Sequence, residues 1–124
     1  MTRRIVIADD EPNIVVALEY LLSREGFDVR VARDGDEALR LVETFRPALA
    51  LLDVTMPRRS GVEVCRKLRA TPDLAGLKIV MLTAKGRETE VELGLAAGAD
   101  LYVTKPFSTR DLVARVVTLL AQRA

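Results

Sequence analysis

The most regular feature of the sequence is a series of five short apolar runs, each followed by a stretch in which apolar residues return every three or four positions. The runs span Ile5 to Ala8, Val29 to Ala32, Ala48 to Leu52, Ile79 to Leu82 and Leu101 to Val103. Runs of this length predict strands, and strands that alternate with helices predict βα units around a parallel sheet. The first, third and fourth runs are apolar throughout, which predicts central strands covered by helices on both faces.

The spacing of apolar residues predicts one helix after each strand. The first three helices run from about Pro12 to Glu25, from about Asp34 to Phe45, and from Gly61 onward. The fourth runs from about Arg87 to Ala97, and the last begins at the capping-box pattern Ser108-Thr-Arg-Asp111. We therefore expect an α/β fold, a three-layer sandwich that fills residues 1–124 as one domain.

The last predicted helix carries more apolar residues than one buried face requires. Its inward stripe, from Leu112 to Leu120, is widened by Val113 and Val117. An apolar face wider than the core needs is typical of a surface that binds a partner, so we expect such a surface here.

The composition of the chain limits the binding partners, the bound metals and the cellular compartment that we expect. Of the 124 residues, 49% are hydrophobic and 30% are charged, and the net charge of +1 offers no general attraction to nucleic acid or membranes. No run of about 18 apolar residues occurs, and the run before Asp9 is too short for a signal peptide, so we expect a cytoplasmic protein. The single cysteine, Cys65, fits a reducing compartment, and the absence of histidine argues against zinc. Any bound metal should prefer oxygen ligands.

Polar residues gather where the central strands end. The first run ends in Asp9-Asp10, the third in Asp53 and the fourth in Thr83, and Lys105 comes just after the fifth. The carboxyl ends of parallel strands lie on one edge of a sheet, where open α/β sheets bind ligands. Neighbouring strands are about 4.8 Å apart, so we expect these side chains to meet in one small pocket.

Three carboxylates in one pocket need compensating positive charge. Without it, at least one of Asp9, Asp10 and Asp53 would have a raised pKa and keep its proton. A divalent cation and the ammonium group of Lys105 would together supply +3 against −3. Mg²⁺ suits the pocket because it binds through one or two carboxylates, water and a phosphate rather than a full protein cage.

A metal alone does not explain Thr83 and Lys105. Both are explained if a phosphoryl group is transferred to Asp53, because carboxylates act as covalent nucleophiles toward phosphate. Mg²⁺ and Lys105 would neutralise the phosphoryl oxygens, and the Thr83 hydroxyl would donate a hydrogen bond to one of them. The residues themselves therefore predict a site of phosphoryl transfer.

Four stretches carry these residues in a fixed order: Asp9-Asp10-Glu11, Asp53 with Pro57 and Gly61 beyond it, Thr83-Ala84, and Tyr102-Val-Thr-Lys105-Pro106-Phe107. This ordered set resembles the response-regulator receiver family of two-component signal transduction, and the similarity covers residues 4 to about 120. The resemblance implies a flavodoxin-like (βα)5 fold, as in CheY, with a parallel sheet of strand order 2-1-3-4-5. It also implies a signalling module rather than an enzyme.

The resemblance gives roles to the matching positions. Asp53 would be the phosphoacceptor, and its donor would be a sensor histidine kinase, a phosphotransfer protein or a small phosphodonor. Asp9 and Asp10 would hold Mg²⁺ together with Asp53 and the backbone carbonyl of Thr55. Lys105 would pair with the acceptor carboxylate and then with the phosphoryl group, and its bond to the following proline would be cis.

The resemblance also implies a conformational switch. Thr83 would move toward the phosphoryl group, and Tyr102 would turn from an exposed to a buried position in the space left behind. These movements would change the surface of the fourth helix, fifth strand and fifth helix, which would then bind a downstream output protein or domain, or a second copy of the chain. Thr55 and Lys85 would set the lifetime of the phosphoryl group.

Simpler interpretations stay open for single residues. Asp9 and Asp10 could cap the following helix, and Asp53 could be a turn residue. Arg58 and Arg59 are most simply solvated loop charges, although their loop borders the site.

Two other functions are open as well. A phosphohydrolase with an aspartate nucleophile would use the same residue types, but that class carries a second carboxylate where this chain has Thr55. The chain could instead be the receiver of a DNA-binding regulator. Asp111 and Arg115 resemble the charged positions through which winged-helix regulators dimerise, whereas Leu93 and Leu101 depart from that pattern. The sequence shows no DNA-binding module, so we expect no direct contact with nucleic acid.

Overall fold

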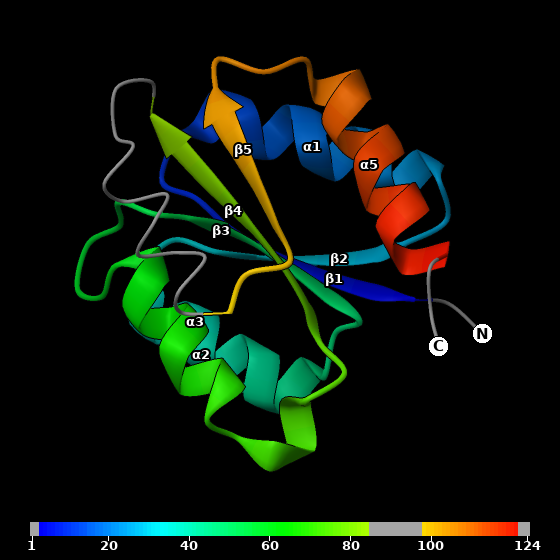
Figure 1. Ribbon diagram of the computed structural model, residues 1–124. Coiled ribbons are helices and arrows are strands. Elements are labelled where there is room, and N and C mark those ends of the chain that lie inside the picture. Colours follow the sequence, from blue (N-terminus) through cyan, green and yellow to red (C-terminus); the bar gives the residue numbers. More distant parts are fainter. Residues whose placement is uncertain (1–2, 85–97, 122–124) are drawn as a thin grey trace.

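The five apolar runs form the five strands of one sheet. The structure, a computed structural model, describes residues 3–84 and 98–121 (Figure 1). The strands are β1 (Arg4–Ala8), β2 (Asp28–Ala32), β3 (Leu49–Asp53), β4 (Lys78–Ala84) and β5 (Leu101–Lys105). Within the described residues the helices are α1 (Pro12–Arg24), α2 (Gly35–Phe45), α3 (Gly61–Arg69) and α5 (Thr109–Ala121), with a 3-10 turn, η1, at Pro72–Leu74. The helix predicted from Arg87 to Ala97 lies outside the described residues.

All neighbouring strands are parallel and follow the order β2-β1-β3-β4-β5. This result confirms the predicted strand order and the α/β fold. The register pairs Ala8 with Leu52, Asp53 with Leu82, and Ala84 with Lys105. The carboxyl ends of β1, β3, β4 and β5 therefore lie along one edge of the sheet.

Helices cover both faces of the sheet, α1 and α5 on one side and α2 and α3 on the other (Figure 1). Each face has its own cluster of buried side chains. Val6 of β1 packs with residues of α2 and α3, whereas its neighbours Ile5 and Ile7 pack with residues of α1 and α5. This division arises because successive side chains of a strand point to opposite faces.

Local polar contacts fix where the helices begin and end. The Asp34 carboxylate accepts a hydrogen bond from the Glu37 N–H at the start of α2, and Ser60 and Glu63 form a reciprocal capping box at the start of α3. Gly26 follows α1 with a φ of +94°, a conformation that glycine adopts without the strain of a side chain.

The end of α1 at Arg24 agrees with the predicted end at about Glu25, the residue that serves as its C-cap. One other prediction, on the last helix, needs correction. Val113, predicted to be surplus on the last helix, is buried in the cluster between α1, α5 and the sheet. α5 packs against α1 as well as against the strands, so it buries a wider face than one sheet contact requires. Val117 keeps 38% of its surface exposed.

No helix in residues 3–84 and 98–121 combines the length and the apolar character needed to cross a membrane.

Candidate functional site

The carboxyl edge of the sheet brings together side chains from three strand ends. Asp9 follows β1, Asp53 is the last residue of β3, and Lys105 is the last residue of β5. β1 and β3 are direct neighbours, and β4 lies between β3 and β5. The convergence predicted from the sequence is therefore present at this edge.

Asp9, Asp10 and Asp53 form an acidic cluster in which one carboxylate oxygen of each residue lies within 4.8 Å of the others. Asp9 is 1% exposed and Asp53 is 5% exposed, whereas Asp10 is open to solvent. Two of the three negative charges are therefore held away from water, where their repulsion is poorly screened.

Lys105 supplies positive charge to this cluster. Its Nζ atom lies 3.2 Å from Oδ2 of Asp9 and 3.4 Å from Oδ2 of Asp53. A third carboxylate is closer still, since Glu11 Oε1 lies 2.6 Å from the same nitrogen. The bond between Lys105 and the following proline is cis, as the resemblance implied.

The pKa values of Asp53 and Lys105 are set by burial and by the neighbouring charges. Burial raises the pKa of Asp53 from 3.8 to about 6, and the nearby charge of Asp9 adds to this rise. The Lys105 ammonium and the N–H of Thr55 favour the ionised form but do not cancel the rise. Burial lowers the pKa of Lys105, yet the hydrogen bond to Glu11 and the charges of Asp53 and Asp9 outweigh it, so that pKa is raised.

The donor set fits a hard divalent cation. Asp9 Oδ2 is fully buried and, among the residues that the structure describes, accepts no hydrogen bond; its neighbour is the Lys105 ammonium. A single ammonium leaves the acidic cluster with excess negative charge. Carboxylate oxygens at this spacing suit an oxygen-preferring metal, and an acidic cluster of this kind is consistent with a metal site.

The structure describes three of the remaining predicted site residues, Thr55, Thr83 and Tyr102. Thr55 is exposed, and its N–H donates to Asp53 Oδ1 at 3.3 Å. Thr83 is buried, and its hydroxyl donates to the carbonyl oxygen of Ala84 at 3.4 Å. Tyr102 is half-buried on β5 against the cluster beneath α2 and α3, with its hydroxyl oxygen shielded from solvent. Lys85 lies outside the described residues.

The interpretation of Asp9 and Asp10 as helix caps is not supported. The N-cap of α1 is Glu11, whose side chain makes no capping hydrogen bond. Asp9 Oδ1 instead accepts the N–H of Glu11 at 2.9 Å, which fixes the turn that leads into the helix. The sequence analysis named Glu11 only as part of Asp9-Asp10-Glu11 and predicted no contact for it. A glutamate at an N-cap position, where Asp or Ser is favoured, could have indicated that this side chain has another partner.

The loop after Asp53 is held against α2, which sequence reasoning did not foresee. Arg59 Nε lies 2.6 Å from Asp36 Oδ1, and Arg58 Nε lies 3.6 Å from Asp34 Oδ2. Arg59 is therefore a paired charge rather than simply a solvated one, whereas Arg58 keeps 69% of its side chain exposed, as expected of a solvated loop charge. Nothing in the local sequence distinguishes these pairings, because they join residues more than twenty positions apart.

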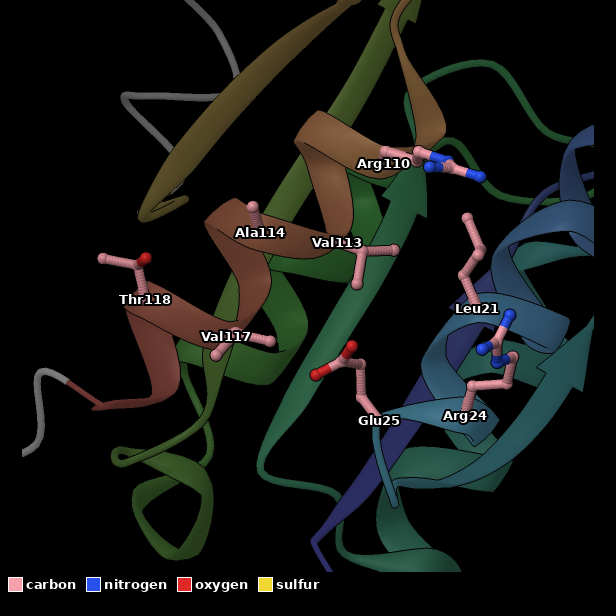
Figure 2. Close-up of a pocket in the computed structure, with 8 residues that line it drawn as sticks. All are labelled: Leu21, Arg24, Glu25, Arg110, Val113, Ala114, Val117 and Thr118. Carbon is pink, nitrogen blue, oxygen red and sulfur yellow. The ribbon is translucent and has the colours of Figure 1, made fainter.

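A cavity of about 700 Å³ lies away from the acidic cluster, between α1 and α5 (Figure 2). Val113 and Arg110 point from α5 toward α1, while Glu25, just after α1, points toward α5 (Figure 2). None of the acidic-cluster residues lines this cavity. This cavity and the acidic cluster are therefore separate sites on the molecule.

The parallel sheet of order β2-β1-β3-β4-β5, with an acidic cluster and a lysine at its carboxyl edge, defines the CheY-like class of flavodoxin-like folds. The chain belongs to the response regulator receiver domain family, whose model matches residues 5–117. Phosphorylation-dependent switching is typical of this family, and a response regulator implies a histidine kinase as partner. A receiver domain is a signalling module rather than a phosphohydrolase, so the hydrolase alternative is set aside.

Individual relatives agree with this result. The chain is 48% identical over 120 residues to the alkaline phosphatase synthesis transcriptional regulatory protein PhoP of Bacillus subtilis (strain 168). That match covers 97% of this chain and 49% of PhoP, so the chain spans about half the length of this relative.

Solved structures show the same fold. A CheY-like response regulator receiver domain protein from Methanospirillum hungatei JF-1 is 31% identical with a TM-score of 0.90, covering 98% of this chain and 96% of that one. The receiver domain of the Francisella response regulator 1452 is 32% identical with a TM-score of 0.86, covering 98% of each chain.

Proposed function

We propose that residues 1–124 form one phosphorylation-dependent signalling switch in which Asp53 accepts the phosphoryl group. The observation that carries this proposal is the position of the Asp53 carboxylate, buried in the acidic cluster and 3.4 Å from the Lys105 ammonium. Asp9 is also buried and lies 3.2 Å from the same ammonium, whereas Asp10 is exposed. Asp53 differs from Asp9 in its place, because it ends β3, the middle strand of the sheet.

In the proposed transfer, an Asp53 carboxylate oxygen forms a bond to phosphorus, and the bond from phosphorus to the donor's leaving atom breaks. The donor leaves with the electron pair; it is an imidazole from a kinase histidine or a carboxylate from an acyl phosphate. Lys105 stabilises the negative charge on the phosphoryl oxygens, and the Thr83 hydroxyl, after turning from Ala84, donates to one of them.

The proposed metal ligands are Asp9, Asp10, Asp53 and the backbone carbonyl of Thr55. Mg²⁺, when bound there, supplies charge neutralisation for the phosphoryl oxygens. The N–H of Thr55 donates to Asp53 Oδ1 and so orients the acceptor carboxylate. The compact spacing of the acidic cluster supports this assignment.

The switch proposed for the output surface uses Thr83 and Tyr102. Thr83 on β4 is paired in register with Thr104 of β5, and Tyr102 is two residues earlier on that same strand. Movement of Thr83 would therefore act on the neighbouring strand that carries Tyr102. We propose that β5 and α5, with the helix predicted from Arg87 to Ala97, bind an output protein or domain, or a second copy of the chain.

The proposed donor is a sensor histidine kinase or a phosphotransfer protein, and the proposed compartment is the cytoplasm, because the lone thiol of Cys65 fits a reducing environment. Transcriptional regulation is a description of the whole PhoP protein, and for this chain we propose only the switch. Direct binding to nucleic acid or to a membrane is not part of the proposal.

The test is to mix the protein with Mg²⁺ and acetyl phosphate and to measure its intact mass over time. We expect the mass of one phosphoryl group to be added to the unaltered protein, to require Mg²⁺, and to be absent from Asp53→Asn. Phosphorylation of Asp53→Asn to the same extent would contradict the assignment of the acceptor. Steady hydrolysis of a phosphate ester such as p-nitrophenyl phosphate over many turnovers would contradict a switch.

A further inference from the structure

Glu11 has no role in the proposed phosphoryl transfer, yet it makes the closest contact with Lys105. Glu11 Oε1 lies 2.6 Å from Lys105 Nζ, compared with 3.2 Å for Asp9 and 3.4 Å for Asp53. We propose that Glu11 is a positioning residue that holds Lys105 in the unphosphorylated protein and competes with the incoming phosphoryl group for its ammonium. This inference rests on the proposed function, and it adds that Glu11 slows the phosphorylation of Asp53.

The Glu11 side chain is not needed to begin the helix. It stands at the N-cap of α1 with extended backbone angles, but it makes no side-chain capping bond. Its backbone N–H is satisfied by Asp9 Oδ1, which leaves the carboxylate free to reach across to β5. Within the described residues, the Glu11 side chain thus has one partner in the structure, the Lys105 ammonium.

The number of donors on Lys105 limits what it can bind. An ammonium group has three N–H donors, and three carboxylates, those of Asp9, Glu11 and Asp53, already surround it. A phosphoryl group on Asp53 brings additional charged oxygens into the same space. The ammonium donates hydrogen bonds to Glu11 and Asp53, so a phosphoryl oxygen must share it with the Glu11 carboxylate or displace that carboxylate.

Burial decides which carboxylate is released. The side chain of Glu11 is 56% exposed, whereas those of Asp9 and Asp53 are 0% and 7% exposed. Glu11 can exchange Lys105 for water at little cost, but the buried Asp9 would be left as an unpaired charge, and the phosphoryl group on Asp53 is itself the new partner of the ammonium. Glu11 is therefore the partner that leaves.

Glu11 also lines a cavity beside Lys105. Glu11 and Lys105 both line this cavity of about 380 Å³ together with Ile14, Ala84, Pro106 and Phe107. The negative charge of Glu11 would repel an anionic phosphodonor near the ammonium. Removing that charge should speed phosphorylation by releasing Lys105 and by reducing repulsion.

The test compares Glu11→Gln with the unaltered protein in the same phosphorylation experiment, at saturating Mg²⁺ and low acetyl phosphate. We expect the initial rate to rise about two- to fivefold, the range for an ion pair with one exposed partner. Glu19→Gln is the matched control, because it removes the same charge from an exposed position of α1 about 12 Å further along the helix. Its rate should stay unchanged.

A second measurement separates competition from metal binding. The Kd of Mg²⁺ for the unphosphorylated protein, measured by isothermal titration calorimetry, should change less than about twofold in Glu11→Gln, since Glu11 is not among the proposed ligands. A Kd raised tenfold or more would make Glu11 part of the metal site and would overturn the inference.

The inference is also overturned if Glu11→Gln is phosphorylated no faster than the unaltered protein, or if Glu19→Gln shows the same increase. Those results would leave the acceptor assignment intact as long as phosphorylation still requires Asp53. A protein that gains no phosphoryl group at all, or gains it equally as Asp53→Asn, would instead overturn the proposed function itself.

Discussion

The carboxylate of Asp53 and the ammonium of Lys105 lie 3.4 Å apart, although 52 positions separate the two residues in the sequence. The two groups do not neutralise each other completely, because Asp9 shares the same ammonium and Glu11 lies closer to it. Burial, with the nearby charge of Asp9, therefore raises the pKa of Asp53 to about 6, and Lys105 does not cancel this rise. A buried carboxylate that is poorly compensated costs stability whenever it is ionised, and it favours ligands that bring positive charge.

The cost of ionising Asp53 predicts a pH-dependent effect of Asp53→Asn in metal-free protein. The pKa is 3.8 when the group is unperturbed and about 6 in the folded protein, so the fold is penalised as pH rises through this range. We expect Asp53→Asn to raise the free energy of unfolding at pH 7 by on the order of 1–3 kcal/mol, and by much less near pH 4. Urea unfolding at both pH values, with EDTA present, measures this difference.

Asp73→Asn, which removes a carboxylate from the exposed η1 turn, is the control for loss of charge alone. A gain in stability of the same size in Asp73→Asn, or a gain in Asp53→Asn that is as large at pH 4 as at pH 7, would show that burial of Asp53 is not the cause.

Mg²⁺ should stabilise the folded protein through the acidic cluster. Binding to the folded state alone adds about 1.4 kcal/mol to the free energy of unfolding at a Mg²⁺ concentration ten times the Kd. We expect Asp9→Asn to remove most of this increment, because Asp9 provides one of the two buried carboxylates. Thermal unfolding with and without Mg²⁺ measures the effect, and Asp73→Asn should keep the full increment. Equal stabilisation of Asp9→Asn would argue against a metal at this cluster.

Gly61 controls how closely α3 approaches the strand that carries Asp53. A Cβ atom at Gly61 would overlap the backbone carbonyl of Asp53, and neither backbone segment can move aside without displacing the acceptor. We expect Gly61→Ala to lower the free energy of unfolding by about 1–3 kcal/mol, as overpacking commonly does. It should also slow phosphorylation, since the loop that carries Thr55 would shift.

Gly76→Ala is the comparison for this substitution, because a Cβ atom there meets nothing within 4 Å. Urea unfolding should show little change for Gly76→Ala. If the two alanine variants were equally stable, close packing between α3 and the end of β3 would not be the reason for a glycine at position 61.

Local pattern was enough to predict the five strands, the helices α1, α2, α3 and α5 of the described residues, and the residues at the strand ends. Each of these features depends on neighbours a few positions apart, as with Pro12 at the start of α1 or Ser108, whose hydroxyl accepts the Asp111 N–H. Parallel topology then required the strand ends to share an edge, so Asp9, Asp53 and Lys105 could be assigned to one pocket in advance. The strand order came from the resemblance to receivers, since periodicity does not define which strands are neighbours.

What the sequence by itself determined is thus which residues stand at the site; the tertiary structure alone decided which of them touch. The sequence alone allows Lys105 to pair with any of several acidic residues. Its contact with Glu11 depends on how α1 and β5 lie relative to each other. Arg69 binds Asp100 and the carbonyl oxygens of Leu77 and Gly98, joining α3 to the start of β5 with no local signal. Such contacts are set by the packing of distant elements, because a side chain's partner is chosen in space, whereas periodicity reports only the face on which it lies.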